Sequence, residues 1–124
     1  MPSTYIQAAG LEVVADVLKT ESILISNPHT EHRGTIDLIK RRVDGYMIAK
    51  KFVMISYNIP NDLLEAAIEI TPGKKSPNIT QLNDSNFKAV SCLVLNKEMN
   101  AKMDELHDLG ASDILTFALS NTRM

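Results

Sequence analysis

The sequence has little of several residue types that would mark particular functions. It contains one cysteine, Cys92, no tryptophan, three tyrosines and three phenylalanines. A lone thiol forms no internal disulfide and, with no signal peptide, favours a reducing cytoplasmic compartment. So few aromatic residues argue against a stacking platform for single-stranded nucleic acid. No apolar run approaches the ~18 residues that span a bilayer, so we expect no membrane segment.

Charge of one sign is also lacking, because the formal net charge is -2 and the sequence pI is about 5.9. This balance gives no net attraction to nucleic acid or to anionic membranes. The basic clusters at 40–42 and 50–51 recur at helical spacing, which favours a solvated helix face over a nucleic-acid site. We therefore expect neither nucleic acid nor membrane as a partner.

What is present suits an ordinary globular domain. The chain has 124 residues, of which 44% are hydrophobic and 23% charged. A chain of this length buries roughly two-thirds of its unfolded surface and needs no disulfide to be stable.

The first third of the chain predicts a helix, a short strand and a second helix. Apolar residues recur at i, i+3, i+4 and i+7 over 8–19, which is typical of an amphipathic helix. The β-branched run 23–25 ends at a turn and predicts a strand. Residues 35–49 again have helical periodicity, although Gly45 interrupts it near the end.

From Phe52 onward the pattern predicts an α+β fold of the ferredoxin-like βαββαβ type. The expected elements are a strand at 52–57, a helix at 61–69, strands at 79–82 and 89–95, a helix at 96–109 and a strand at 113–119. Asn61 and Asn96 are the expected helix caps, and Gly110 is the expected stop. Helices then cover one face of the sheet, and another subunit or the N-terminal helices would cover the other.

Single residues offer few catalytic or metal sites. His29 and His32 flank Glu31, but two close histidines without cysteine fall short of the four ligands of structural zinc. Cys92 lies in an apolar strand and is expected to be a small buried hydrophobe, since no partner base is evident. We expect His107 to be exposed on the last helix.

The loop 71–78 is the most informative stretch, because two prolines and a glycine fix its path. Lys74, Lys75, Ser76 and Asn78 could receive an anion there. The alternative is a turn that only reverses the chain, and on these residues both readings remain open.

Read in order, several segments resemble the long form of ATP phosphoribosyltransferase, which catalyses the first step of histidine biosynthesis. The similar segments lie in its C-terminal regulatory domain and linker helix, at 39–45, 52–58, 71–77, 87–91, 103–106, 109–114 and 120–123. Residues 8–14 are similar to the end of the family's catalytic domain.

The resemblance implies a division into 1–34, a remnant of an α/β catalytic domain, 35–50, a linker helix, and 51–124, a PII/ACT-like regulatory domain. Only Ser3, Thr4 and Tyr5 stand where the family's phosphate-binding loop would be, without its glycine. The resemblance therefore implies no catalysis and no cofactor for this chain, and magnesium only for a full-length enzyme.

The resemblance also implies a histidine-binding site that mediates feedback inhibition. The positions that match it are Asn58, Ser76, Asn78, Leu93 and Asp113. Two of them depart from the family, which usually has threonine at position 78 and often has aspartate at position 58. Losing a negative charge at Asn58 would weaken a contact with the ligand's ammonium group.

The family assembles around three-fold axes, so the resemblance implies a homo-oligomer with trimeric or hexameric contacts. Two other functions fit the same sequence. One is an assembly module whose sheets pack together without any ligand, and the other is a sensor that acts on a separate partner protein.

Overall fold

The computed structural model describes Ile6, residues 8–84 and residues 86–124. The chain divides into two units between Glu31 and His32, and the second unit is His32–Met124. The second unit contains α2 (Arg33–Ala49), β1 (Phe52–Pro60), α3 (Leu64–Ile70), β2 (Asn78–Gln81), β3 (Phe87–Leu95), α4 (Met99–Leu109) and β4 (Ser112–Ala118).

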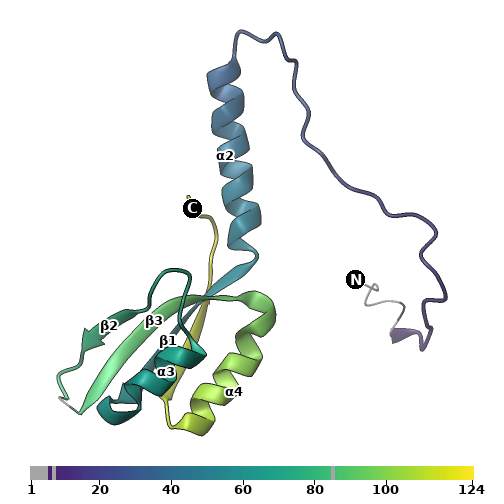
Figure 1. Cartoon of the computed structure of the whole chain (residues 1–124). Helices are drawn as coiled ribbons and strands as arrows, with labels where there is room; N and C mark the ends of the chain where they lie inside the picture. Colours follow the sequence, from purple (N-terminus) through teal and green to yellow (C-terminus); the bar gives the residue numbers. More distant parts are fainter. Residues whose placement is uncertain (1–5, 7, 85) are drawn as a thin grey trace. The chain divides into compact units, whose positions relative to one another are not determined.

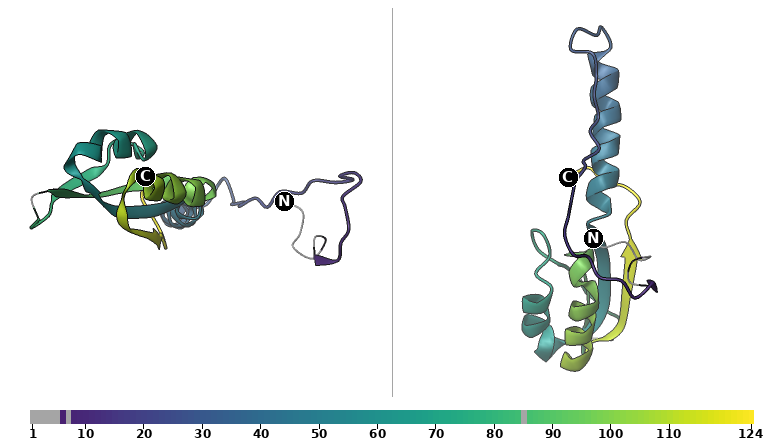
Figure 2. Two further views of the ribbon diagram at one scale, coloured as in Figure 1. Left: turned by 90° about the horizontal axis from the view of Figure 1, so that it is seen from below. Right: turned by 90° about the vertical axis from the view of Figure 1, so that its right-hand side faces the viewer.

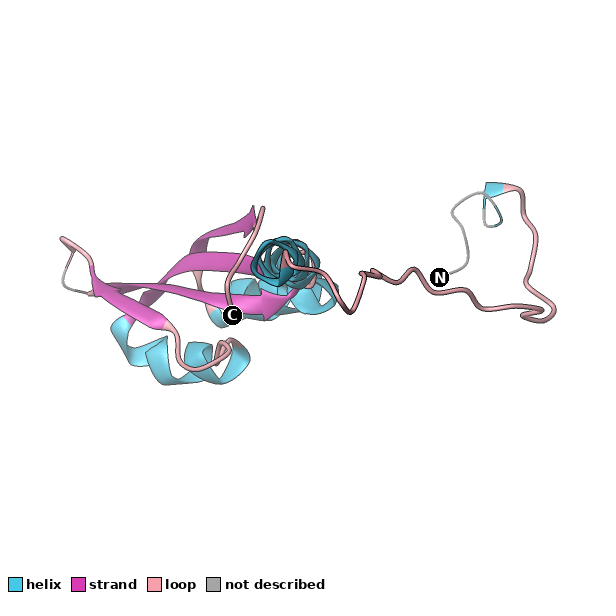
Figure 3. Cartoon of the chain, turned by 90° about the horizontal axis from the view of Figure 1, so that it is seen from above, coloured by secondary structure: helices cyan, strands magenta, loops and turns pink. Residues whose placement is uncertain are grey.

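The four strands form one sheet in the order β2-β3-β1-β4. Every neighbouring pair is antiparallel, and β2 and β3 form the expected hairpin. Helices α3 and α4 lie on the same face of the sheet (Figure 1, Figure 3). This arrangement confirms the predicted α+β, ferredoxin-like βαββαβ fold.

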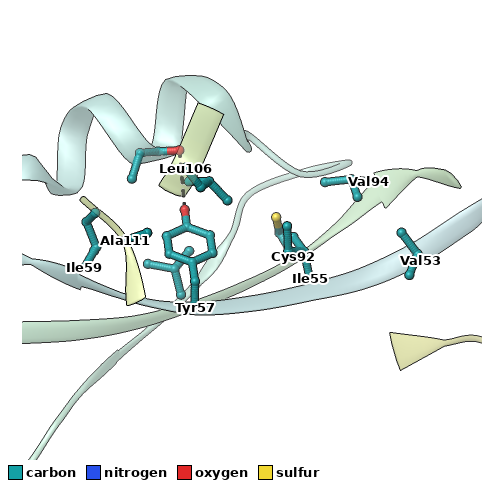
Figure 4. Close-up of a cluster of buried hydrophobic side chains, with 10 residues drawn as sticks. Val53, Ile55, Tyr57, Ile59, Cys92, Val94, Leu106 and Ala111 are labelled. Atoms are coloured by element: carbon teal, nitrogen blue, oxygen red, sulfur yellow. Dashed lines mark hydrogen bonds between the residues drawn. The ribbon is translucent and has the colours of Figure 1, made fainter. Parts of the chain in front are cut away.

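Alternation along the central strands builds the core (Figure 4). On β1 the side chains of Val53, Ile55, Tyr57 and Ile59 are buried, and the residues between them are half-buried. Because successive side chains point to opposite faces of a sheet, β1 and β3 present one apolar face to the helices. Leu106 of α4 is fully buried against that face.

Cys92 belongs to this core, as predicted, and is a free, buried thiol. Its Sγ donates to the Thr71 carbonyl at 3.5 Å, and burial raises the pKa of the thiol. A buried thiol with a raised pKa is a poor nucleophile, so its contribution is to packing.

The helix ends differ in part from the prediction. Gly110 ends α4 with φ 114°, a left-handed conformation that favours glycine, as expected. The expected caps at Asn61 and Asn96 are wrong, because each asparagine instead begins a 3₁₀ turn that leads into the α-helix. Neither Leu63 nor Glu98, which precede α3 and α4, makes a side-chain cap hydrogen bond.

The helix at 35–49 is confirmed as α2, which contains Gly45 and continues without a break to Ala49. The basic clusters at 40–42 and 50–51 are exposed, as a solvated face requires. Lys40 forms an ion pair with Asp44 one turn along the helix, at 2.6 Å.

The helix expected at 8–19 and the strand expected at 23–25 are wrong. Residues 11–26 form neither helix nor strand. Their apolar side chains are exposed, with Val14 at 100% and Leu18 at 80%. A single helix of about 12 residues is marginal in water unless its apolar face packs on another surface. The prediction for Ser3, Thr4 and Tyr5 lies outside the described residues.

Candidate ligand site

The loop between α3 and β2 is fixed to the core at its first residue. Thr71 is fully buried, and its Oγ1 lies 2.7 Å from the Tyr57 hydroxyl and 3.1 Å from the Ala67 carbonyl. The Tyr57 hydroxyl lies 3.4 Å from the same carbonyl (Figure 4). Burial raises the pKa of Tyr57, so its hydroxyl stays protonated and can donate.

Gly73 then turns the loop over β3. Its φ of 70° lies in the left-handed region, and an added Cβ would lie 3.2 Å from the Cβ of Cys92. Both observations favour glycine at this position. The loop therefore leaves the core along a fixed path that places the following polar residues over the sheet edge.

A cavity of about 520 Å³ opens beside this loop. Ser76, Asn78 and Leu93 line it together, and so do Lys74 and Lys75. Strand pairing explains the meeting, because Asn78 is paired with Ser91, two residues from Leu93. This size lies within the range of about 300–1,000 Å³ that is usual for small-molecule sites.

The other two predicted residues meet elsewhere. The Asn58 amide donates to the Asp113 carboxylate at 3.0 Å. Asp113 has φ 51° and lies at the irregularity in the β1–β4 pairing, between the pairs Ser56–Leu115 and Asn58–Ser112. A non-glycine residue in this conformation is strained and often marks a functional position. Asp113 lines a second cavity of about 350 Å³, together with Asp104 and His107.

The structure thus brings the predicted site residues into two groups and not one. We call Ser76, Asn78 and Leu93 the loop half, and Asn58 with Asp113 the acidic half. Leu93 is paired with Met54, which lies four residues from Asn58 along β1. At roughly 3.3 Å per residue, about 13 Å of strand separates the two halves.

The charges of the two halves are opposite. The charged residues that line the cavity of the loop half are Lys74, Lys75 and Arg123. The cavity of the acidic half is lined by Asp104 and Asp113, with His107 as its one basic group. His107 is exposed, as predicted. The loop half therefore suits a carboxylate, and the acidic half suits an ammonium group.

The family model for the HisG C-terminal domain matches residues 49–121, more than half of the chain. The chain belongs to the HisG C-terminal domain family.

Relatives of this HisG C-terminal domain are named ATP phosphoribosyltransferase, a glycosyltransferase. Those of Yarrowia lipolytica and Saccharomyces cerevisiae are each 41% identical over 95% of the chain. That of Pseudarthrobacter chlorophenolicus is 39% identical over 96% of the chain. The chain spans only 40% to 43% of the length of these curated relatives.

Sequence reasoning missed the contribution of the last residues of the chain. Thr122, Arg123 and Met124 line the cavity of the loop half, although they lie outside the matched range 49–121. The one signal for their position was Gly45, a glycine inside a predicted helix, where a close backbone approach is a common reason for glycine.

Metal and membrane sites receive no support from the described residues. Among them, no group of three or more histidine, cysteine, aspartate or glutamate side chains could hold a metal ion. The pair His29 and His32 is therefore not part of such a group. No helix in the described part of the chain is long and apolar enough to cross a membrane.

Proposed function

We propose that this chain is the regulatory part of an ATP phosphoribosyltransferase, the enzyme that joins ATP and phosphoribosyl pyrophosphate, and that it binds histidine. The observation that carries the proposal is the meeting of Ser76, Asn78 and Leu93 around one cavity in a HisG C-terminal domain. Ser76 and Asn78 come from the loop and the start of β2, and the pairing of β2 with β3 brings Leu93 beside them.

The charges support a free amino acid as the ligand. An amino acid carries an ammonium and a carboxylate group, and each requires a partner of opposite sign or a set of hydrogen bonds. The carboxylate would bind at the loop half. The ammonium group would bind at Asp113 and at the Asn58 side-chain oxygen, because the Asn58 amide nitrogen already donates to Asp113.

Within one copy of the chain, the loop half and the acidic half lie too far apart to contact the same ligand. About 13 Å of β1 separates them, which is longer than an extended histidine. We therefore propose a homo-oligomer in which the loop half of one copy meets the acidic half of a second copy. The sheet face away from α3 and α4 supports such packing, because Leu115 and Phe117 of β4 are 53% and 52% exposed.

Catalysis would belong to a region outside these residues. Among the described residues, no group of three or more histidine, cysteine, aspartate or glutamate side chains could hold a metal ion, and we assign no metal-dependent step to them. We expect no pyrophosphate release when the purified chain is mixed with ATP, phosphoribosyl pyrophosphate and magnesium. Pyrophosphate release above background would contradict that expectation.

Titration calorimetry with L-histidine and L-leucine tests the proposed ligand. We expect heat from histidine alone, and a higher melting temperature in its presence because the ligand binds the native state. Asp113→Asn should weaken binding about tenfold or more, since it removes the charge that meets the ammonium group. Glu65→Gln, an exposed position of α3 that lines neither cavity, is the matched control and should bind as the wild type does.

A second candidate is an assembly module that binds no ligand, and the exposed Leu115 and Phe117 also favour it. In that case the melting temperature rises with protein concentration, while histidine and leucine both leave it unchanged.

A further inference from the structure

The last six residues of the chain, which we call the tail (119–124), return along α2 after β4 ends (Figure 1, Figure 2). The Asn121 side-chain amide donates to the Arg42 carbonyl at 3.4 Å. Within the tail, Arg123 Nη1 donates to the Thr122 carbonyl at 2.7 Å and to the Asn121 side-chain oxygen. The tail therefore contacts α2, and hydrogen bonds to the helix and within the tail hold it there.

The contact between tail and helix depends on Gly45. This glycine is buried, and a Cβ built on it would overlap the Thr122 carbonyl and the side chains of Asn121 and Arg123. Backbone overlap of this kind cannot be relieved by rotating a side chain. Glycine lowers helix stability relative to alanine, so the position gains close approach of the tail at the expense of helix propensity.

The same tail also walls the loop half of the site. Thr122, Arg123 and Met124 line both the cavity of about 520 Å³ beside the loop and a cavity of about 340 Å³ against α2. Lys74 of the loop donates to the Met124 sulfur at 3.2 Å. One short segment therefore touches the loop on one side and the helix on the other.

We propose that the tail is a strap that closes the loop half over a bound amino acid and transmits the closure to α2, with Arg123 receiving the ligand's carboxylate. The proposal rests on the function proposed above. It adds residues outside the matched family range and a route by which binding reaches the helix that leads out of the domain.

Arg123 suits this role by its chemistry. Both of its hydrogen bonds use Nη1, so its other two nitrogens have no hydrogen-bond partner in the described part of the chain. A guanidinium carries five donors in a planar fork and binds carboxylates in a bidentate manner. The same cavity is lined by Lys74 and Lys75. Each of these carries a point charge on a flexible side chain and cannot bind a carboxylate through a planar fork as arginine does.

Calorimetry with two ligands tests Arg123. Arg123→Gln should weaken histidine binding about tenfold or more, because a charge-assisted bond to the carboxylate is lost. It should leave unchanged the weaker binding of histamine, which lacks the carboxylate. Lys97→Gln, on the 3₁₀ turn Asn96–Glu98, removes a charge outside the cavity and should bind histidine as the wild type does.

Substitutions at two glycines of α2 test whether the strap must pack closely against this helix. Gly45→Ala should lower the melting temperature and abolish the slowing of hydrogen exchange that we expect histidine to cause in residues 41–50. Gly34→Ala, in the same helix, is the matched control, because nothing lies within 4 Å of its added Cβ. It should melt at or above the wild-type temperature and keep the exchange response.

The outcomes separate the two proposals. If the wild type binds no histidine, the proposed function is overturned. If the wild type binds histidine, and Arg123→Gln and Gly45→Ala bind it equally well with the same exchange response, the strap is overturned while the proposed function stands.

Discussion

The segment of residues 8–31 and the unit His32–Met124 differ in how their apolar side chains are buried. In the segment, Val14 and Val17 are 100% and 97% exposed. In the unit, Ile55 and Ile59 are fully buried between sheet and helices. The comparison teaches that apolar periodicity produces an element only where its apolar face has another surface to pack on.

The largest expected effect contrasts one apolar side chain from each region. Ile55→Ala should lower the free energy of unfolding by about 2–5 kcal/mol, because it leaves a cavity in a packed core. Val14→Ala should change it by less than about 0.5 kcal/mol, since an exposed side chain loses little. Urea denaturation of the full chain measures both, and equal effects would mean that the segment packs as the unit does.

The buried polar anchor of the loop sharpens the comparison within the unit. Thr71→Val removes the hydroxyl between Tyr57 and the Ala67 carbonyl, which should cost about 1–3 kcal/mol of unfolding free energy. Thr80→Val on the exposed edge strand β2 is the control and should be nearly neutral. The idea that Thr71 fixes the loop is lost if both variants unfold at the same urea concentration.

Alkaline pH offers a smaller, graded test of the same core. Burial raises the pKa of Cys92 above its ordinary 9.0 and that of Tyr57 above its ordinary 10.0. As pH rises, the unfolded chain therefore releases these protons first, so the free energy of unfolding falls from about pH 9 upward. Tyr57→Phe should make the decline above about pH 10 less steep, and urea denaturation at several pH values measures it. An equally steep decline in the variant would contradict this contribution of Tyr57.

Much of the unit follows directly from local pattern. Strands β1 and β3 are nine residues long, and apolar residues alternate or follow one another along each of them. Helix α4 carries an apolar stripe and ends at Gly110. These signals are strong because burial, periodicity and turn chemistry agree. The predicted caps at Asn61 and Asn96 were wrong because a 3₁₀ turn that begins at each asparagine precedes the α-helix.

The site was predictable only in its residue types. Nothing local shows that Asn58 lies beside Asp113, since 55 residues separate them and strand pairing brings them together. The split into two halves is likewise set by the register of β1 and β3. The role of the tail depends on a contact between Gly45 and residues at the other end of the unit, which periodicity cannot reveal.

The proposal that two copies share one histidine site is tested most directly by mixing two defective variants. Asn78→Ala damages the loop half, and Asp113→Asn damages the acidic half. Calorimetry should show weak histidine binding by each variant alone and tight binding by a fraction of sites after the two are mixed and allowed to exchange subunits. If the mixture binds no better than either variant, although light scattering shows mixed oligomers, each site lies within one chain and the account is contradicted.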